Sequence, residues 1–137
     1  MEKEVEKIET VEQLEDALLG HIGTSQYYYH PYRRQAVRTD GTRDYTLKGN
    51  CMWIWDVIIT EVYDKLRQNR VLDIFYLTVE VDEEAKCYMK LLDYQDNLIW
   101  DKNLEFVTHP VGSMTTYVGW NGPDQDFALI WCLPSEN

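Results

Sequence analysis

The sequence predicts an α+β fold, in which one long central helix and a short N-terminal helix pack on a roughly five-stranded antiparallel sheet. Three observations support this prediction. Apolar residues recur with helical spacing across residues 49–69, they alternate with polar residues across much of 71–133, and polar turn sequences separate the alternating runs. The length favours a single domain over residues 1–137, since domains commonly have ~100–150 residues.

A short helix is predicted after an acidic lead-in of residues 1–9. Thr10 and Gln13 have the spacing of a capping box, in which each side chain bonds to the backbone N–H of the other residue. Apolar residues three and four positions apart follow these two residues. The pattern therefore predicts a helix from Val11 to Leu19.

The rest of residues 10–48 is a connection rich in tyrosine and arginine. Four tyrosines lie within six positions, next to histidines and the Arg33–Arg34 pair. Asp40–Gly41 is a turn signal between two short apolar stretches. We expect an irregular, partly extended connection that includes a short hairpin at this turn.

The central helix, predicted over residues 49–69, has the clearest periodicity in the chain. Its apolar residues recur at the i, i+3, i+4, i+7 spacing of one helix face. Asn50 is placed to act as the N-cap. The first two turns are apolar almost all round, so we expect this end of the helix to be inserted into the core.

Residues 71–133 change to a period of two, which predicts strands. Alternating or apolar runs occupy residues 74–81, 85–92, 98–106, 115–120 and 127–133. Because the connections are short, we expect an antiparallel meander with the central helix on one face. The other face is also apolar, and two explanations stay open. Either the N-terminal helix and the tyrosine segment cover it, or a second subunit does so in a homodimer.

The charge of the chain is strongly negative and unevenly distributed. The formal net charge is −11, and residues 21–50 are the one basic window. Phosphate repulsion over most of the surface disfavours broad nucleic-acid binding, whereas a partner with a basic surface is favoured. Direct binding of nucleic acid is therefore the weaker expectation.

The compartment is predicted from the cysteines and from the hydropathy. Cys51, Cys87 and Cys132 form no CxxC pair and lie in apolar runs, as buried free thiols in a reducing cytoplasm do. No apolar run approaches the ~18 residues of a membrane span, and the N-terminus is acidic where a signal peptide is basic. We expect a cytoplasmic protein without a membrane segment.

No catalytic residue, cofactor or metal site is predicted. The chain has no GxSxG, no glycine-rich phosphate loop and no HExxH. A cysteine–histidine pair from Cys51 or Cys132 with His30 or His109 is disfavoured, since an apolar surrounding disfavours the thiolate. Asp56, among tryptophans, is expected to be half-buried and to pair with an arginine or a tyrosine hydroxyl.

Two sets of residues are candidate partner-binding sites. The acidic set lies mostly in turns and can imitate the charge of a nucleic-acid backbone; it comprises Asp82, Glu83, Glu84, Asp93, Asp96, Asp101, Asp124 and Asp126. The Tyr/Arg set has the residue types of protein interfaces and of single-strand stacking platforms; it comprises Tyr28, His30, Tyr32, Arg33, Arg34 and Arg38. For both sets the alternative is structural: a solvated acidic surface, and tyrosines and arginines engaged within the molecule.

Four short motifs in order resemble an uncharacterised family of small bacterial and phage proteins, a domain of unknown function. Its pattern is G-T-x-x-Y-Y-x-H, then T-D-G, then W-[LI]-x-D, and finally L-P-S-E-Y. The matching segments here are Gly23–His30, Thr39–Gly41, Trp53–Asp56 and Leu133–Glu136, with Asn137 in place of the final tyrosine. The resemblance spans roughly residues 14–137. It implies that the protein is encoded by a phage or another mobile element, and it implies no activity.

These observations together lead to one functional hypothesis. The chain is expected to be a non-enzymatic, acidic protein of phage or mobile-element type that acts in the host cell cytoplasm. It would bind and inhibit a host nucleic-acid-handling protein such as a CRISPR or restriction effector, that is, act as an anti-CRISPR or anti-restriction inhibitor. Two alternatives stay open: binding of nucleic acid or nucleotide through Tyr27–Arg38, and a small ligand-binding or enzymatic α+β cup near Asp56.

Overall fold

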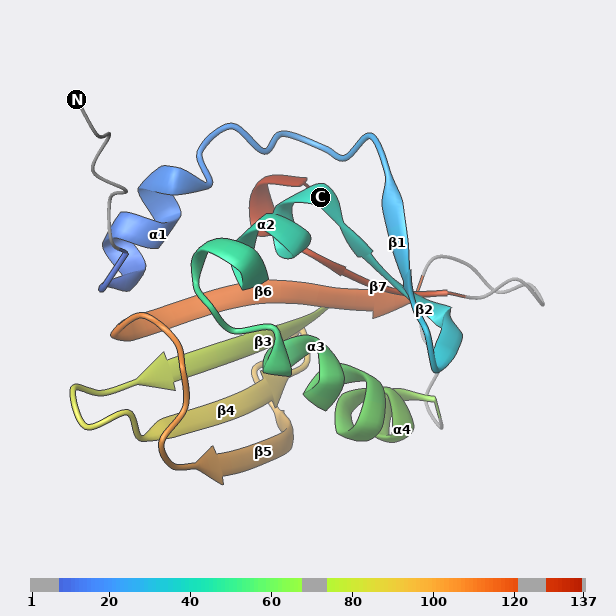
Figure 1. The fold of residues 1–137 in the computed structure, drawn as a ribbon. Helices are drawn as coiled ribbons and strands as arrows, with labels where there is room; N and C mark the ends of the chain where they lie inside the picture. Colours follow the sequence, from blue (N-terminus) through green and yellow to red (C-terminus); the bar gives the residue numbers. More distant parts are fainter. Residues whose placement is uncertain (1–7, 68–73, 121–127, 137) are drawn as a thin grey trace.

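The computed structural model describes residues 8–67, 74–120 and 128–136, which form one mixed seven-stranded sheet with helices packed against it (Figure 1). The strands are β1 (Tyr27–His30), β2 (Arg33–Thr39), β3 (Ile74–Val81), β4 (Cys87–Leu92), β5 (Leu98–Leu104), β6 (Gly112–Trp120) and β7 (Leu129–Cys132). Their order across the sheet is β1-β2-β7-β6-β3-β4-β5. Strands β2 and β7 are parallel, and the other neighbours are antiparallel.

The predicted five-stranded antiparallel meander is wrong. Strand β6 pairs with β3 instead of β5, and the β1–β2 hairpin extends the sheet beyond β7. The connection 105–111 is long enough for the first difference, because seven extended residues span about 23 Å, whereas three strand spacings need about 14 Å. The chain can therefore pass both β4 and β3, and it places the apolar face of β6 beside that of β3.

The helices are short. They are α1 (Val11–Ala17), α2 (Asp40–Lys48), a continuous segment made of α3 (Trp53–Val57), a π-helical turn η1 (Ile58–Val62) and α4 (Tyr63–Leu66), and a final 3₁₀ turn η2 (Pro134–Glu136). The predicted long central helix over 49–69 is therefore wrong, because the helical segment runs only from Trp53 to Leu66. Asn50 does not cap it but has a φ of 52°, in the left-handed region, within the connection that follows α2.

The Asp40–Gly41 pair does not close a hairpin but begins α2. Thr39 and Thr42 form a capping box at this helix start. The backbone N–H of Gly41 donates to Glu136 Oε2 at 2.9 Å, so a carboxylate lies at the N-terminus of α2. The hairpin of this region is instead formed by β1 and β2, which turn at Pro31–Tyr32.

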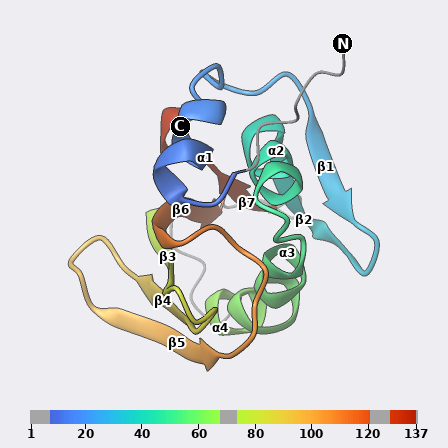
Figure 2. The ribbon, with the colours of Figure 1, turned by 60° about the vertical axis from the view of Figure 1, so that its left-hand side comes forward.

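The core lies between the sheet and the helices. Trp55 stacks on Trp131 with ring centroids 5.7 Å apart, and Tyr45 packs against Trp131 from α2. Helix α1 lies beside the first half of β6, where β7 does not reach, as Figure 2 shows. Gly112 makes this approach possible, because a Cβ there would lie 2.9 Å from Cβ of Val11.

In the described part of the chain, neither the N-terminal helix nor the tyrosine segment covers the opposite face of the sheet, as had been considered. The tyrosine segment forms the edge strand β1 within the sheet, and α1 packs into the core beside β6. On this face Tyr76 and Tyr117 are half-buried and cover each other, with a T-shaped contact at 5.2 Å. Cover by a second subunit in a homodimer stays a prediction.

Candidate functional site

The predicted acidic set does not form one surface. Asp82, Glu83 and Glu84 occupy the β3–β4 turn, whereas Asp93 and Asp96 occupy the β4–β5 turn. These turns lie at opposite ends of β4, whose six residues extend about 20 Å. The remaining members are dispersed or undescribed: Asp101 lies on β5 and accepts a hydrogen bond from the hydroxyl of Tyr88, and Asp124 and Asp126 lie outside the described residues.

Two aspartates of this set have a structural role in their turns. The Oδ1 atoms of Asp82 and Asp93 each accept backbone N–H bonds of 2.9–3.0 Å from residues two and four positions later. Ala85 and Asp96 have left-handed backbone, with φ of 62° and 63°. The hydrogen bonds, first that from the backbone of Asn97, hold the pKa of Asp93 below its ordinary value. The carboxylates of Asp82 and Asp93 therefore stabilise the two turns and are not free to bind a partner through these oxygens.

A larger group of carboxylates gathers at one end of the molecule, which we call the acidic end and define as residues 9–17, 80–90 and 105–113. Its nine acidic residues are Glu9, Glu12, Glu15, Asp16, Glu80, Asp82, Glu83, Glu84 and Glu105. Its lysines are Lys86 and Lys90, which pair with Glu84 and Glu80 at 3.4 and 3.7 Å. Helix α1, the β3–β4 turn and the β5–β6 connection lie together on the left in Figure 1.

Long-range backbone bonds bring these three segments together. The N–H of Val11 donates to the carbonyl oxygen of Val111 at 2.8 Å, and Val81 is paired with Gly112 in the sheet. The N–H of Val107 donates to the carbonyl oxygen of Ala85 at 3.1 Å. No local pattern indicates these contacts, so the contribution of Glu80 and of the carboxylates of α1 could not be predicted from the sequence.

The acidic end also has a groove and an exposed aromatic side chain. The groove has a volume of about 590 Å³, and Glu80, Asp82 and Glu105 line it together with Lys86. Next to Glu105, the side chain of Phe106 is 86% exposed, and its φ is 58°. A bulky residue rarely adopts this backbone conformation, so the chain holds Phe106 in solvent at a cost in backbone strain.

The Tyr/Arg set is divided between the interior and the surface. His30 and Arg38 are buried, Tyr32 and Arg34 are exposed, and Tyr28 lies beneath the guanidinium of Arg43 at 4.7 Å from its ring centroid. Arg33 is held at 4.4 Å over the ring of Tyr63 and at 3.3 Å from Asp64. The set is therefore largely engaged within the molecule and presents no continuous stacking platform.

His30 has partners on both ring nitrogens. Its Nδ1 accepts the backbone N–H of Tyr32 at 3.1 Å, so Nε2 holds the proton and donates to Asp56 Oδ1 at 3.1 Å. The expectation for Asp56 is wrong, because its side chain is 71% exposed and its partner is this histidine. The interior beneath the pair is filled by Trp55 and Trp131, so a cup near Asp56 has no support from the packing.

The four motif segments form one connected network around the start of α2. Asp40 accepts hydrogen bonds from the backbone and side chain of Ser25 and from the hydroxyl of Tyr28, at 2.8–2.9 Å. These bonds, led by that from the Ser25 backbone, hold the pKa of Asp40 well below its ordinary value. Glu136 joins the C-terminal motif by accepting from Thr39 Oγ1 at 2.6 Å, and His30–Asp56 joins the tryptophan motif.

The cysteines and the remaining histidines do not form catalytic pairs in the described chain. Burial raises the pKa of Cys51 to about 12 and that of Cys132 to about 11, which disfavours both thiolates. His109 donates from Nδ1 to the carbonyl of Pro110 and accepts the hydroxyl of Tyr45 at Nε2, both at 2.6 Å. Across the described residues, no three side chains of His, Cys, Asp or Glu are arranged to hold a metal ion.

The comparisons with known proteins identify a family and no activity. Residues 12–137 match the model of a family of unknown function, DUF6876. This match confirms the resemblance to an uncharacterised family. No curated protein and no solved structure is significantly similar to the chain. In the described part of the chain, no helix is long and apolar enough to cross a membrane.

Proposed function

We propose that this chain, which belongs to the family of unknown function DUF6876, is a non-enzymatic protein that binds a partner with a basic surface. The observation that supports this proposal most is the acidic end, whose three segments contain nine carboxylates and two lysines, with Lys48 as a further cation at the end of α1. Carboxylates at this density attract a cationic surface over a Debye length of about 8–10 Å at physiological salt. The acidic end thus favours fast, salt-dependent association.

Phe106 gives the proposed interface an apolar centre. Exposed aromatic side chains are typical hot spots of protein interfaces, and a surrounding ring of polar groups excludes water from them. The side chain of Phe106 follows Glu105 directly and is held in solvent by a strained backbone. In the complex, we expect Phe106 to fill an apolar pocket of the partner while the carboxylates meet its cations.

The partner that fits this chemistry best is a host protein that handles nucleic acid. Such proteins have basic grooves for phosphates, and carboxylates on a rigid frame can occupy a groove of this kind. We propose in particular inhibition of a CRISPR or restriction effector in the host cytoplasm by a protein of phage or mobile-element origin.

A phage-challenge assay tests this function directly. The protein is expressed in a panel of bacterial strains, each with one defined CRISPR or restriction system, and plaque formation by a targeted phage is counted. If the proposal is correct, plaque formation rises at least ten-fold in one strain and stays unchanged in the strain without a defence system. Unchanged plaque counts throughout the panel would contradict the inhibitory function.

A matched pair of variants then tests the surface. Glu83→Gln with Glu105→Gln removes two charges from the acidic end, and Asp96→Asn with Asp64→Asn removes two charges elsewhere, in the β4–β5 turn and on α4. We expect the first pair, and Phe106→Ser, to weaken binding to the identified effector by about ten-fold or more, and the second pair to change it less than about two-fold. Equal losses for the two charge pairs would show that net charge matters and the acidic end does not.

A further inference from the structure

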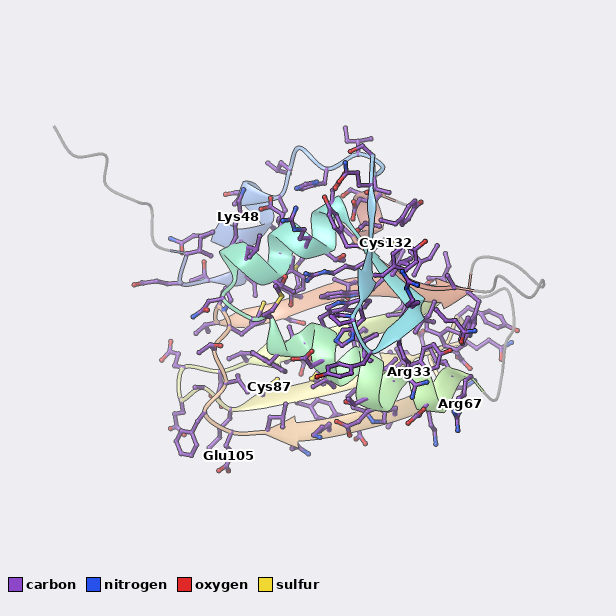
Figure 3. All side chains as sticks on the ribbon, turned by 45° about the vertical axis from the view of Figure 1, so that its right-hand side comes forward. Arg33, Lys48, Arg67, Cys87, Glu105 and Cys132 are labelled. Carbon is purple, nitrogen blue, oxygen red and sulfur yellow. The ribbon has the colours of Figure 1, made fainter. Side chains whose placement is uncertain are left out.

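Arg38 is a buried cation that forms no direct ion pair with a carboxylate of the described residues. The residue is 9% exposed, and its guanidinium lies 5.6 Å from the ring centroid of Trp55. Nη1 donates to Thr46 Oγ1 at 3.0 Å and to Met52 Sδ at 3.3 Å, while Nε has no acceptor among the described residues. Figure 3 shows this side of the molecule, with β1 and β2 in front.

This arrangement is unusual for a buried arginine. Removing a guanidinium from water is costly, so a buried charge is normally paired with an opposite charge. A thioether sulfur is only a weak acceptor, and a hydroxyl contributes no charge. The carboxylate of Asp56 attracts Arg38 through its charge, but it is already bonded to His30. An unsatisfied buried group of this kind calls for an explanation such as a missing ion.

A second arginine lies close to the first and has the same sign of charge. Arg43 extends from α2 over the ring of Tyr28, and its Nη1 donates to the hydroxyl of Tyr28 at 3.3 Å. Tyr28 is the cross-strand partner of Arg38 in the sheet. Burial, and then the charge of Arg43, lower the pKa of Arg38. Two acids line the same hollow as Tyr28 and Arg43. Asp40 has its oxygens engaged by Ser25 and Tyr28, and Asp44 pairs with His21 and Lys48.

We propose that Arg38 and Arg43 bind a phosphate-type oxyanion, either inorganic phosphate or the phosphate group of a monoester. Paired guanidinium groups suit this ligand, because their N–H groups match the oxygens of a phosphate in geometry and charge. The sulfur of Met52 now occupies an acceptor position next to Nη1. Met52 is 44% exposed and unbranched, so it can move aside without opening the core.

This site is independent of the acidic end. Its residues come from β1, β2, α2 and the residue before α3, and none belongs to the segments that form the acidic end. Phosphate binding can therefore fail without affecting the proposed interaction with a basic partner, and the converse also holds.

Titration with inorganic phosphate tests the site, with sodium chloride at equal ionic strength as the reference. We expect phosphate to raise the Tm of the wild-type protein saturably and to give a dissociation constant by calorimetry. Arg38→Met and Arg43→Gln should each weaken phosphate binding by about ten-fold or more. The control is Arg34→Gln, which removes the same charge from an exposed position on β2 and should change the affinity less than about two-fold.

Two further measurements make the test specific. Met52→Ala removes the competing sulfur and should tighten phosphate binding relative to wild type. Arg38→Met should unfold at a Tm at least equal to that of wild type without phosphate, because a buried unpaired charge is gone. If this variant does not fold, Arg43→Gln and Met52→Ala still decide the question.

The outcome also identifies the source of the phosphate. Tighter binding of adenosine monophosphate or of phosphoserine than of inorganic phosphate assigns a monoester, and equal affinity assigns the free ion. The proposal is overturned if phosphate shifts the wild-type Tm no more than chloride does, or if Arg34→Gln weakens binding as much as Arg43→Gln.

Discussion

Two regions of the molecule use their carboxylates differently. In the network formed by the four motifs the carboxylates hold the fold together, whereas at the acidic end they face solvent. Around the start of α2, Asp40 and Glu136 each accept hydrogen bonds from at least two residues and connect distant segments. At the acidic end, Glu83 and Glu105 lie in or after turns and are exposed to solvent. The motifs therefore describe how this chain folds, whereas its surplus charge is available for a partner.

The largest effect on stability is expected at Glu136. Its carboxylate accepts from Thr39 Oγ1 at 2.6 Å and from the backbone N–H groups of Gly41 and Leu133 at 2.9 Å. Glu136→Ala should lower the free energy of unfolding by about 2–3 kcal/mol, measured by urea denaturation, because charge-assisted bonds are lost and their donors are left unpaired. Ser135→Ala, on the exposed neighbour in η2, should cost less than about 0.5 kcal/mol. Equal costs would show that the network does not hold this side together.

The next effect is a change in pH dependence at Asp40. The folded pKa of this carboxyl is depressed by the hydrogen bonds from Ser25 and Tyr28, so its stabilisation is present above the unfolded pKa of about 3.9 and is lost as pH falls below it. Asp40→Asn cannot titrate. The free energy of unfolding of this variant should therefore fall less steeply than that of wild type between about pH 4 and pH 2. Parallel curves would contradict the structural role of the Asp40 carboxylate.

The sequence predicted those parts of the fold that local patterns determine. Alternation placed β3 through β7 close to their observed positions, whereas the polar strands β1 and β2 were missed because Arg33–Thr39 has no apolar face of its own. Asp40–Gly41 was interpreted as a turn, since the carboxylate that holds it in a helix start is Glu136, 95 residues further along. The predicted helix was too long because Cys51, although apolar and buried, belongs to the connection.

The candidate sites, too, could be predicted from the sequence only where local patterns determine them. The turn acids were recognised from their density in the sequence, but their division between two ends of β4 depends on strand order. The contribution of α1 to the acidic end depends on the bond between Val11 and Val111. Arg38 was named as one residue of the Tyr/Arg set, but its burial follows from the packing of β2 against Trp55. Long-range pairing determined each of these features.

A smaller effect separates two neighbours within the β3–β4 turn. Asp82 supports the turn by accepting the N–H groups of Glu84 and Lys86, whereas Glu83 makes no such bond to the turn. Asp82→Ala should therefore lower the free energy of unfolding by about 1 kcal/mol, and Glu83→Ala should change it by less than about 0.5 kcal/mol. The comparison of the two variants by urea denaturation distinguishes structural from free carboxylates in one loop. Similar losses would mean that charge, and not the hydrogen bonds of Asp82, stabilises this turn.

The smallest effect on stability is expected for the surplus charge itself. Glu83→Gln with Glu105→Gln should leave the free energy of unfolding within about 0.5 kcal/mol of wild type, with a slight gain at low salt because repulsion between like charges is reduced. That gain should vanish in 1 M salt, where the Debye length is about 3 Å. Urea denaturation at both salt concentrations measures the difference. A loss above about 1 kcal/mol in both conditions would place these carboxylates among the structural ones, and the acidic end would then have no surplus charge to offer a basic partner.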